Sequence, residues 1–262
     1  MSNDKTAFEV PLGKATSAFT KLLRELSTDG KQVIEKLDDD PTYARRIARF
    51  MRAGGYSPST DQKRAREIMG SNFLGVEDVI KHFGISLTDD EVSALWDIPF
   101  PESVLQERKN THILFPGYPL TILDIRGKVP RELFRSLEDA WYNGEKFAKK
   151  EKVALRWYLI RKDIIQNSTG KTYQGQTALL ADTEEIPRAC EVVYMIILYY
   201  LVYQKRLFES LYGRCADVSS SGYRVDVGSF DLLGLRVGSW ADSRDGRVGL
   251  AASRKLLNLV QP

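Results

Sequence analysis

The sequence predicts an α+β protein in which helices are segregated from a mostly antiparallel sheet. Three observations carry this prediction. A long helix is expected over Ile186–Phe208, and its central run Val192–Tyr203 is apolar on nearly every side, which is typical of a buried helix. Short β-type runs precede this helix. Beyond Leu211 the chain alternates apolar and polar residues with glycine punctuation, which predicts several short strands.

The first 110 residues are expected to form an N-terminal helical region. Phe19, Leu22, Leu23 and Leu26 fall at helical spacing and predict a short amphipathic helix. This region is treated as one domain, residues 1–110, and the rest of the chain, residues 111–262, as a second.

Asp61–Leu95 predicts a cluster of small helices within the first domain. Thr88 is expected to cap one of them, with Glu91 completing a capping box. A further short helix is expected over Pro101–Asn110. The helix–Gly–helix pattern of Gly75–Trp96 also allows a helix-turn-helix interpretation. The acidic start of its second helix would repel phosphates, so a packing role is favoured over nucleic-acid binding.

The second domain is expected to begin with short strands. His112–Phe115 and Leu120–Ile125 are β-type runs separated by Pro and Pro–Gly signals. Pro130–Leu137 is typical of a helix. Val153–Ile160 is rich in aromatic and branched residues and predicts a strand.

The long apolar helix follows an acidic group. Pro187 lies in its expected first turn, where a missing N–H costs nothing. Asp182, Glu184 and Glu185 precede it, and we expect these charges to favour the positive end of the helix dipole rather than to act in acid–base chemistry.

The segment after the helix predicts strands joined by glycine-rich turns. Tyr223–Val227 alternates, Gly228 interrupts the pattern, and Leu235–Val237 resumes it. Asp242–Gly246 is typical of a loop, and Gly249–Leu257 predicts a last apolar strand.

Composition and charge limit the class of protein. The chain has 262 residues, 43% of them hydrophobic, and a formal net charge of +3, which is too small to indicate nucleic acid or an anionic membrane. Its longest apolar run is shorter than the about twenty residues that a spanning helix needs. Met1–Thr20 lacks a secretory signal. We expect a soluble, cytoplasmic protein without a membrane span, and display on a cell surface or virion stays open.

Signals for catalysis and metal binding are weak. The only histidines, His82 and His112, are expected to be structural, and the only cysteines, Cys190 and Cys215, to be reduced and packed. Neither a phosphate-binding loop nor a nucleophile-turn motif occurs, and no His or Cys pair has metal-ligand spacing. We therefore expect no enzyme activity, no cofactor and no metal.

The composition of the tail is unusual. Ser210–Arg254 contains no Lys, Glu, Gln or Met, although these types make up about one in five of the preceding residues. The same segment contains six Arg and five Asp, so burial does not explain the gap. Aromatic and Arg residues among Ser, Gly and Asp are typical of a recognition surface, with an ordinary turn-rich domain end as the alternative. These residues are Tyr223, Arg224, Phe230, Arg236, Trp240, Arg244 and Arg247.

A set of motifs between Asp61 and Leu257 resembles one microbial protein family. The motifs are WYLIRK at Trp157–Lys162, NSTGKTY at Asn167–Tyr173, QTALL at Gln176–Leu180, Glu185-Ile186-Pro187, Arg206–Glu209, GYRVDVGSFDLLGLRV at Gly222–Val237 and VGLAASRK at Val248–Lys255, with weaker likeness at Gly70–Gly84 and Leu120–Lys128. On these motifs the chain resembles the variable proteins of diversity-generating retroelements, which are found in bacteria and phages.

The resemblance implies a C-type-lectin-like domain with a mixed, mostly antiparallel sheet and a long buried helix, preceded by a small helical region. In such systems a reverse transcriptase copies a template RNA and randomises adenines, and the copy replaces the end of the target gene. Mutated Asn codons then yield Tyr, Ser, Asp, Gly, Arg or Leu. They do not yield Lys, Glu, Gln, Met or Trp while the third base stays a pyrimidine, which agrees with the gap in Ser210–Arg254.

The resemblance also implies a hypervariable surface that binds a protein or another macromolecular ligand without catalysis. The changeable positions would be Tyr223, Asp226, Ser229, Leu232, Leu233, Arg236, Gly238, Ser239, Ser243, Arg244, Gly246 and Arg247, with Trp240 as a fixed anchor beside the site. A homo-oligomer is an open alternative to a monomer.

The alternation of the tail strands separates framework from display positions. The framework side chains Val225, Val227, Leu235 and Val237 are expected to face inward. Asp226 and Arg236 are expected to face outward. Tyr223 shares the parity of Val225.

Two other functions stay open. A formylglycine-generating-enzyme-like catalyst would have the same fold type but needs a cysteine pair, which Cys215 alone does not supply. A DNA-binding protein would use Lys63–Arg66 and the helical pair. Calcium-dependent lectins use a Trp-Asn-Asp run, of which Trp240-Ala241-Asp242 is only a partial echo, so we expect neither calcium nor sugar as a ligand.

Overall fold

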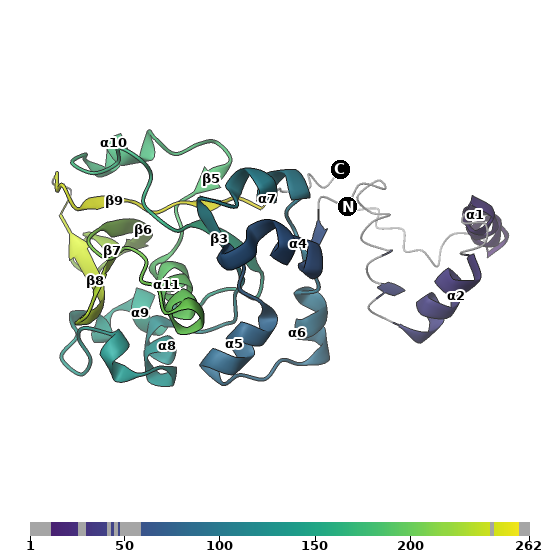
Figure 1. Ribbon diagram of the computed structural model, residues 1–262, viewed down its shortest axis with the longest axis horizontal. Helices are drawn as coiled ribbons and strands as arrows, with labels where there is room; N and C mark the ends of the chain where they lie inside the picture. Colours follow the sequence, from purple (N-terminus) through teal and green to yellow (C-terminus); the bar gives the residue numbers. More distant parts are fainter. Residues whose placement is uncertain are drawn as a thin grey trace, which may run out of the picture. The chain divides into compact units, whose positions relative to one another are not determined.

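The computed structural model describes residues 12–25, 30–40, 43–44, 47, 59–241 and 244–256. The chain divides into two compact units, Met1–Ser57 and Pro58–Pro262. The first unit holds α1 (Leu12–Glu25) and α2 (Gly30–Asp39) (Figure 1). The amphipathic helix predicted around Phe19 is α1, and Leu26 lies outside the described residues.

The second unit begins with a helical cluster. Thr88 N donates to Glu91 Oε2 over 2.9 Å and Glu91 N donates to Thr88 Oγ1 over 3.3 Å, so the predicted capping box is confirmed. The cluster belongs to the same compact unit as the sheets, Pro58–Pro262, whereas the sequence predicts a domain boundary after residue 110. Its elements are β1 (Thr60–Asp61), α4 (Gln62–Met69), η3 (Gly70–Asn72), α5 (Val76–Phe83), α6 (Asp89–Ala94), β2 (Asp97–Ile98) and α7 (Glu102–Arg108), with β1 and β2 antiparallel.

A first four-stranded sheet joins segments that are far apart in the sequence. Its order is β3-β4-β10-β5 and every neighbouring pair is antiparallel. The short strand β10 lies between β4 and β5, so the C-terminal end of the described chain completes this sheet. The strands are β3 (His112–Pro116), β4 (Trp157–Arg161), β5 (Glu184–Glu185) and β10 (Ser253–Arg254).

A second four-stranded sheet is built by the glycine-rich tail. Its order is β8-β7-β6-β9, with β6 and β9 parallel and the other pairs antiparallel. The protein is therefore α+β, as predicted, with mostly antiparallel strands. The strands are β6 (Tyr212–Val218), β7 (Arg224–Asp231), β8 (Gly234–Trp240) and β9 (Val248–Leu250).

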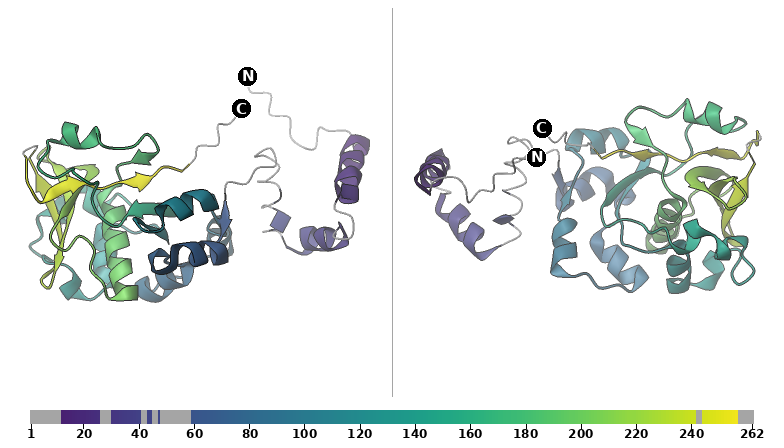
Figure 2. Two further views of the ribbon diagram at one scale, coloured as in Figure 1. Left: turned by 45° about the horizontal axis from the view of Figure 1, so that its top comes forward. Right: turned by 180° about the vertical axis from the view of Figure 1, so that it is seen from behind.

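The predicted long helix is α11 (Ala189–Tyr203), which is shorter at both ends than the sequence indicated. Every residue from its start to Tyr199 is buried. It lies in the middle of the unit and contacts α5 on one side and β6 and β7 on the other (Figures 1 and 2). Glu191 caps it by accepting from Arg188 N over 2.8 Å, and Asp217 of β6 accepts from Ala189 N over 2.6 Å.

Two local predictions are wrong. Leu120–Ile125 was expected to be a strand, but α8 (Ile122–Lys128) begins there, because Thr121 and Asp124 form a capping box that outweighs the β-branched composition. The helix expected over Pro130–Leu137 is a single turn, η4 (Arg131–Leu133), after which the chain is extended. The remaining short helices are η5 (Trp141–Gly144), α9 (Lys146–Lys149) and α10 (Tyr173–Thr177).

The sequence predicts that Glu184 stabilises the start of the long helix, but the structure places it elsewhere. It is buried on β5, where its Oε1 lies 3.5 Å from Nη1 of Arg108, 3.5 Å from Nη1 of Arg161 and 3.8 Å from Nε2 of His112. The imidazole of His112, together with the two guanidinium groups, lowers the pKa of Glu184 to about 2. Burial lowers the pKa of His112, so this imidazole is neutral at pH 7.

Cys190 and Cys215 are both free and buried, as predicted. Among the helices of the described residues, none has the length and apolar character that a membrane crossing requires.

Candidate functional site

The β7–β8 hairpin carries most of the predicted display positions. Val227 pairs with Val237, and Val225 pairs with Ser239, so these residues share one face of the sheet. Asp226 pairs with Gly238 on the opposite face. The predicted inward orientation of the framework side chains is confirmed. Val225 is 0%, Val227 0%, Leu235 1% and Val237 6% exposed, and all four belong to the core cluster that contains α11.

The connection from β8 to β9 is described at Ala241 and at residues 244–247. It links the two edges of the sheet, because the strand order is β8-β7-β6-β9. Arg214, whose side chain lies on the outer face away from α11, donates from Nη2 to the carbonyl of Ala241 over 3.2 Å, and Gly170 N donates to that of Asp245 over 2.8 Å. We call the described residues of this connection, 241 and 244–247, the crossover loop.

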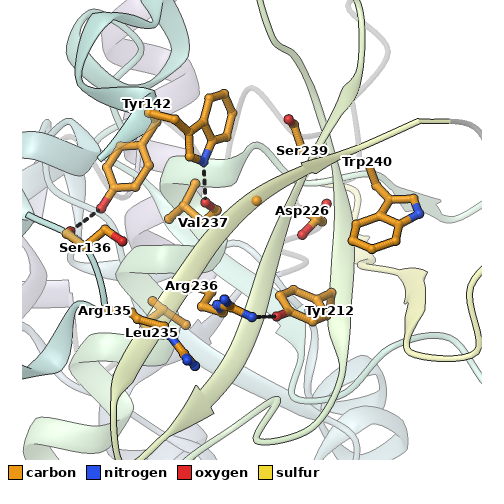
Figure 3. A pocket seen from close by; sticks show the side chains of 12 residues that line it. Arg135, Ser136, Tyr142, Tyr212, Asp226, Leu235, Arg236, Val237, Ser239 and Trp240 are labelled. Atoms are coloured by element: carbon orange, nitrogen blue, oxygen red, sulfur yellow. Dashed lines mark hydrogen bonds between the residues drawn. The ribbon is translucent and has the colours of Figure 1, made fainter. Parts of the chain in front are cut away.

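A pocket of about 370 Å³ lies along β8 (Figure 3). It combines residues of the hairpin with residues that are far away in the sequence. Its lining consists of Arg135, Ser136, Trp141, Tyr142, Tyr212, Asp226, Leu235, Arg236, Val237, Gly238, Ser239 and Trp240.

The segment after η4 covers the open edge of β8. Arg135 N donates to the carbonyl of Leu235 over 3.1 Å, and Trp141 Nε1 donates to the carbonyl of Val237 over 2.8 Å. These bonds satisfy groups that an edge strand would leave to water or to another chain. Figure 3 shows Tyr142 and Val237 on the side of β8 away from Trp240.

Arg236 and Trp240 frame the pocket on the outer face. Arg236 is exposed, and its Nη1 donates to the hydroxyl of Tyr212 on β6 over 3.1 Å. Trp240 is 36% exposed at the end of β8. Both residues share a face with Gly238, which lies between them.

Asp226 was expected to face outward and to be exposed. It does lie on the outer face, but it is only 1% exposed, so the expected exposure is wrong. Burial raises the pKa of Asp226 to about 7, against the opposite influence of Arg214 and Arg236, and Asp245 of the crossover loop adds to the rise. Its Oδ2 has no hydrogen-bond partner among the described residues. Arg214 of β6, which pairs with Asp226, is buried as well and donates to Gln176 of α10 and to Ala241, so residues distant in the sequence cover this part of the outer face.

Gly238 and Gly246 are both predicted display positions, but their surroundings differ. A Cβ on Gly238 would lie 2.5 Å from Oδ1 of Asp226, which is closer than two such atoms can approach. A Cβ on Gly246 would have nothing within 4 Å. Position 246 therefore accepts side chains freely, whereas position 238 accepts one only if residue 226 changes or moves.

The exposed loop positions lie at more than one place. Arg244, Gly246 and Arg247 are exposed in the crossover loop, and Ser243 lies outside the described residues. Arg247 precedes Val248, which pairs with Tyr212 at the start of β6. Tyr223 is 48% exposed and immediately precedes Arg224, which pairs with Val218 and Trp240 at the opposite end of the sheet. None of these described residues lines the pocket.

The hairpin turn is a separate place. Leu232 is 86% and Leu233 is 62% exposed, and both lie at the end of the hairpin away from Trp240. At about 3.4 Å per residue, the turn is about 20 Å from Trp240. Ser229 is partly buried in the bulge before the turn, with a left-handed φ of 47°. The structure does not bring these three residues to the pocket.

Besides the framework residues Leu235 and Val237, five pocket residues had no part in the site predicted from the tail: Arg135, Ser136, Trp141, Tyr142 and Tyr212. Tyr212 could have been found, because it begins the strand that precedes Tyr223 and is aromatic. The other four are about a hundred residues away in the sequence, and no spacing rule connects them to the tail.

Comparisons of the chain with protein-family models, with curated proteins and with solved structures found no match in any of the three. The chemistry of the site is therefore judged from its own geometry. The pocket offers one buried carboxylate, two guanidinium groups, hydroxyl groups and two indoles. Within the described part of the chain, no three His, Cys, Asp or Glu side chains gather as a metal site. Such a set suits recognition by hydrogen bonds and stacking.

Proposed function

We propose that the chain is a non-enzymatic ligand-binding protein whose C-terminal end is diversified by a retroelement and displayed on a C-type-lectin-like scaffold. One observation carries the proposal. In the tail, the framework residues Val225, Val227 and Val237 are buried, while the changeable residues Arg236 and Arg247 are exposed. The pleat of the strands thus separates these buried valines from the exposed arginines, while Asp226 is a changeable position that is buried.

This separation has an energetic meaning. Substitutions at exposed positions away from special contacts usually change stability by about 0.5 kcal/mol or less. Substitutions of buried valines by polar residues cost several-fold more. The hairpin is bounded by β6 on one side and by the 134–141 segment on the other, so its backbone is held independently of the outward side chains. A held backbone also lowers the ordering cost of binding.

The shape of the site favours a macromolecular ligand. Exposed Arg236 lines a pocket of about 370 Å³ in which Trp240 is partly exposed, and Arg244 and Arg247 are exposed in the crossover loop. Arg and Trp are enriched where proteins contact one another. The pocket accommodates a side chain, and the crossover loop provides a wider contact area.

The catalytic alternative gains no support from the thiols. Cys190 and Cys215 are buried, and burial raises the pKa of both thiols, which disfavours the reactive thiolate. The DNA-binding alternative would place phosphates near α6, whose first turn carries Asp89, Asp90 and Glu91. We therefore retain binding by the tail as the proposed function.

A matched pair of multiple variants tests the display role. The surface variant combines Arg236→Ser, Arg244→Ser, Gly246→Ser and Arg247→Ser. Its control combines Val225→Ser and Val237→Ser in the same strands. We expect the surface variant to keep the Tm of the parent within a few degrees and the control to lose cooperative unfolding. Unfolding of the surface variant would contradict the proposal.

The origin of the diversity has its own test, which is the DNA beside the gene. A near-repeat of the codons for 222–249 that differs mainly at adenines, next to a reverse-transcriptase gene, is the expected result. A complete flanking sequence without such a repeat would remove the retroelement from the proposal and leave only the binding surface.

A further inference from the structure

Gly238 lines the pocket without a side chain of its own, and the Asp226 carboxylate occupies the space that a Cβ of residue 238 would take. Asp226 pairs directly with Gly238, and the diagonal neighbours on β8 are Arg236 and Trp240. The carboxylate is therefore bordered along β8 by Arg236 and Trp240. Figure 3 shows the carboxylate beside Trp240, with the Arg236–Tyr212 pair below it.

One oxygen of this carboxylate lacks a hydrogen-bond donor. Oδ2 of Asp226 is buried and has no partner among the described residues. The two neighbouring guanidinium groups make hydrogen bonds to other residues: Arg214 Nη1 donates to Gln176 Oε1 over 3.1 Å and its Nη2 to the carbonyl of Ala241 over 3.2 Å, and Arg236 Nη1 donates to Tyr212 Oη over 3.1 Å. A buried acceptor without a donor is costly, because it has lost water and gained nothing in exchange. A ligand group that brings a donor would remove that cost.

We propose that this pocket takes a basic side chain of a protein ligand, with Asp226 as its counter-ion and the indole of Trp240 as its flat neighbour. The inference rests on the proposed function, because it names the ligand chemistry of the same surface. A hydrogen bond between two charged groups is about twice as strong as one between neutral groups. A guanidinium or ammonium beside an indole also gains a cation–π interaction.

The proposal predicts how binding depends on pH. The charged and titratable groups that face Asp226 are Arg214 and Tyr212 of β6, Arg236 of β8 and Asp245 of the crossover loop. Burial raises the pKa of the carboxyl to about 7, so the ionised form is scarce below that pH. A cation binds the ionised form, and its affinity therefore rises as pH increases through 7. A ligand that accepts a hydrogen bond from the neutral carboxyl shows the opposite dependence.

The experiment uses the full chain and two small probes. Nα-acetyl-arginine amide carries the cation, and Nα-acetyl-citrulline amide has nearly the same shape and keeps N–H donors without the charge. Binding is followed by NMR shifts of the Trp240 indole and the Ser239 amide. At one pH unit above the carboxyl pKa, we expect the arginine probe to bind about tenfold more tightly than the citrulline probe, and one unit below it we expect the two to converge.

Variants distinguish this site from a general surface attraction. Asp226→Asn should reduce the arginine probe to the affinity of the citrulline probe. Gly238→Ala should weaken the binding of both probes, because its Cβ takes the space beside the Asp226 carboxylate. Gly246→Ala is the control, because a Cβ there has nothing within 4 Å. If Asp226→Asn does not fold, the comparison of the two probes on the parent protein still decides.

Three results would overturn the inference. These are equal affinity of the two probes, no saturable binding of either, or unchanged arginine binding in Asp226→Asn. Failure here is distinct from failure of the proposed function. If the probes do not bind while the surface variant stays folded, the display role stands and only the ligand chemistry falls.

Discussion

Gly238 and Asp226 compete for one space on adjacent strands. They are direct partners across β7 and β8, and a Cβ at residue 238 would lie 2.5 Å from Oδ1 of Asp226. The contact is with a side chain, but that side chain is only 1% exposed and cannot swing into solvent. The two positions are therefore coupled: which residue one of them tolerates depends on the residue at the other.

This coupling predicts a non-additive pair of substitutions. Gly238→Ala should lower the free energy of unfolding by about 1–3 kcal/mol, because it overpacks the space beside Asp226. In the background of Asp226→Ala the same substitution should cost at least about 1 kcal/mol less. Denaturant unfolding of the four proteins in the cycle measures this difference. Gly246→Ala is the control and should change stability by about 0.5 kcal/mol or less. Equal costs in both backgrounds would contradict the coupling.

Asp226 also predicts a pH dependence of stability. Burial raises its pKa from the ordinary 3.8 to about 7, so the folded state binds the proton more tightly than the unfolded state. Stability from this group is fully present below the unfolded pKa and is lost as pH rises toward 7. Relative to Asp226→Asn, the parent should lose on the order of 3 kcal/mol between about pH 4 and pH 7. Parallel pH curves for the two proteins, measured by denaturant unfolding, would show that the carboxyl is not perturbed.

Glu184 predicts the opposite dependence on pH. Its pKa is lowered to about 2 by His112, Arg161 and Arg108, so its stabilising contribution is present above the unfolded pKa and is lost as pH falls toward 2. Glu184→Gln leaves the two partly buried guanidinium groups without their carboxylate and should cost about 3 kcal/mol at pH 7. The difference from the parent, followed by thermal or denaturant unfolding, should shrink as pH falls.

The neighbouring carboxylate provides the control for Glu184. Glu185 pairs with Arg156 at 3.5 Å, but its side chain is 41% exposed. Glu185→Gln should therefore cost less than about 1 kcal/mol. If both substitutions had the same small effect, the buried ion cluster would not contribute to stability as described.

Trp141 predicts a local change at the edge of the tail sheet. Trp141→Phe removes the bond from Nε1 to the carbonyl of Val237 but keeps a ring near Phe147, whose centroid is 5.7 Å away. We expect a loss of about 1 kcal/mol and faster amide hydrogen exchange in β8. Tyr223→Phe, at an exposed position, is the control. Unchanged exchange in β8 would mean that Trp141 does not hold this edge.

Part of the fold followed from neighbouring residues alone. The Thr88–Glu91 capping box and the buried helix α11 were predicted, because a cap and an apolar run act within one or two turns. The same kind of rule could have predicted α8, since Thr121 and Asp124 have the spacing of a capping box. The β-branched residues of that segment favoured a strand instead.

The sequence by itself determined which tail residues share a face: Val225 and Val237 point inward and Arg236 outward, because strand side chains alternate. Only the tertiary structure decided that Asp226, on the correct face, is buried. Alternation sets a direction, whereas burial depends on which distant residues pack against that face, and here Arg214 beside Asp226 is bonded to Gln176 of α10 and to Ala241. For the same reason the segment that carries Trp141 could join the pocket only when folding placed it along β8.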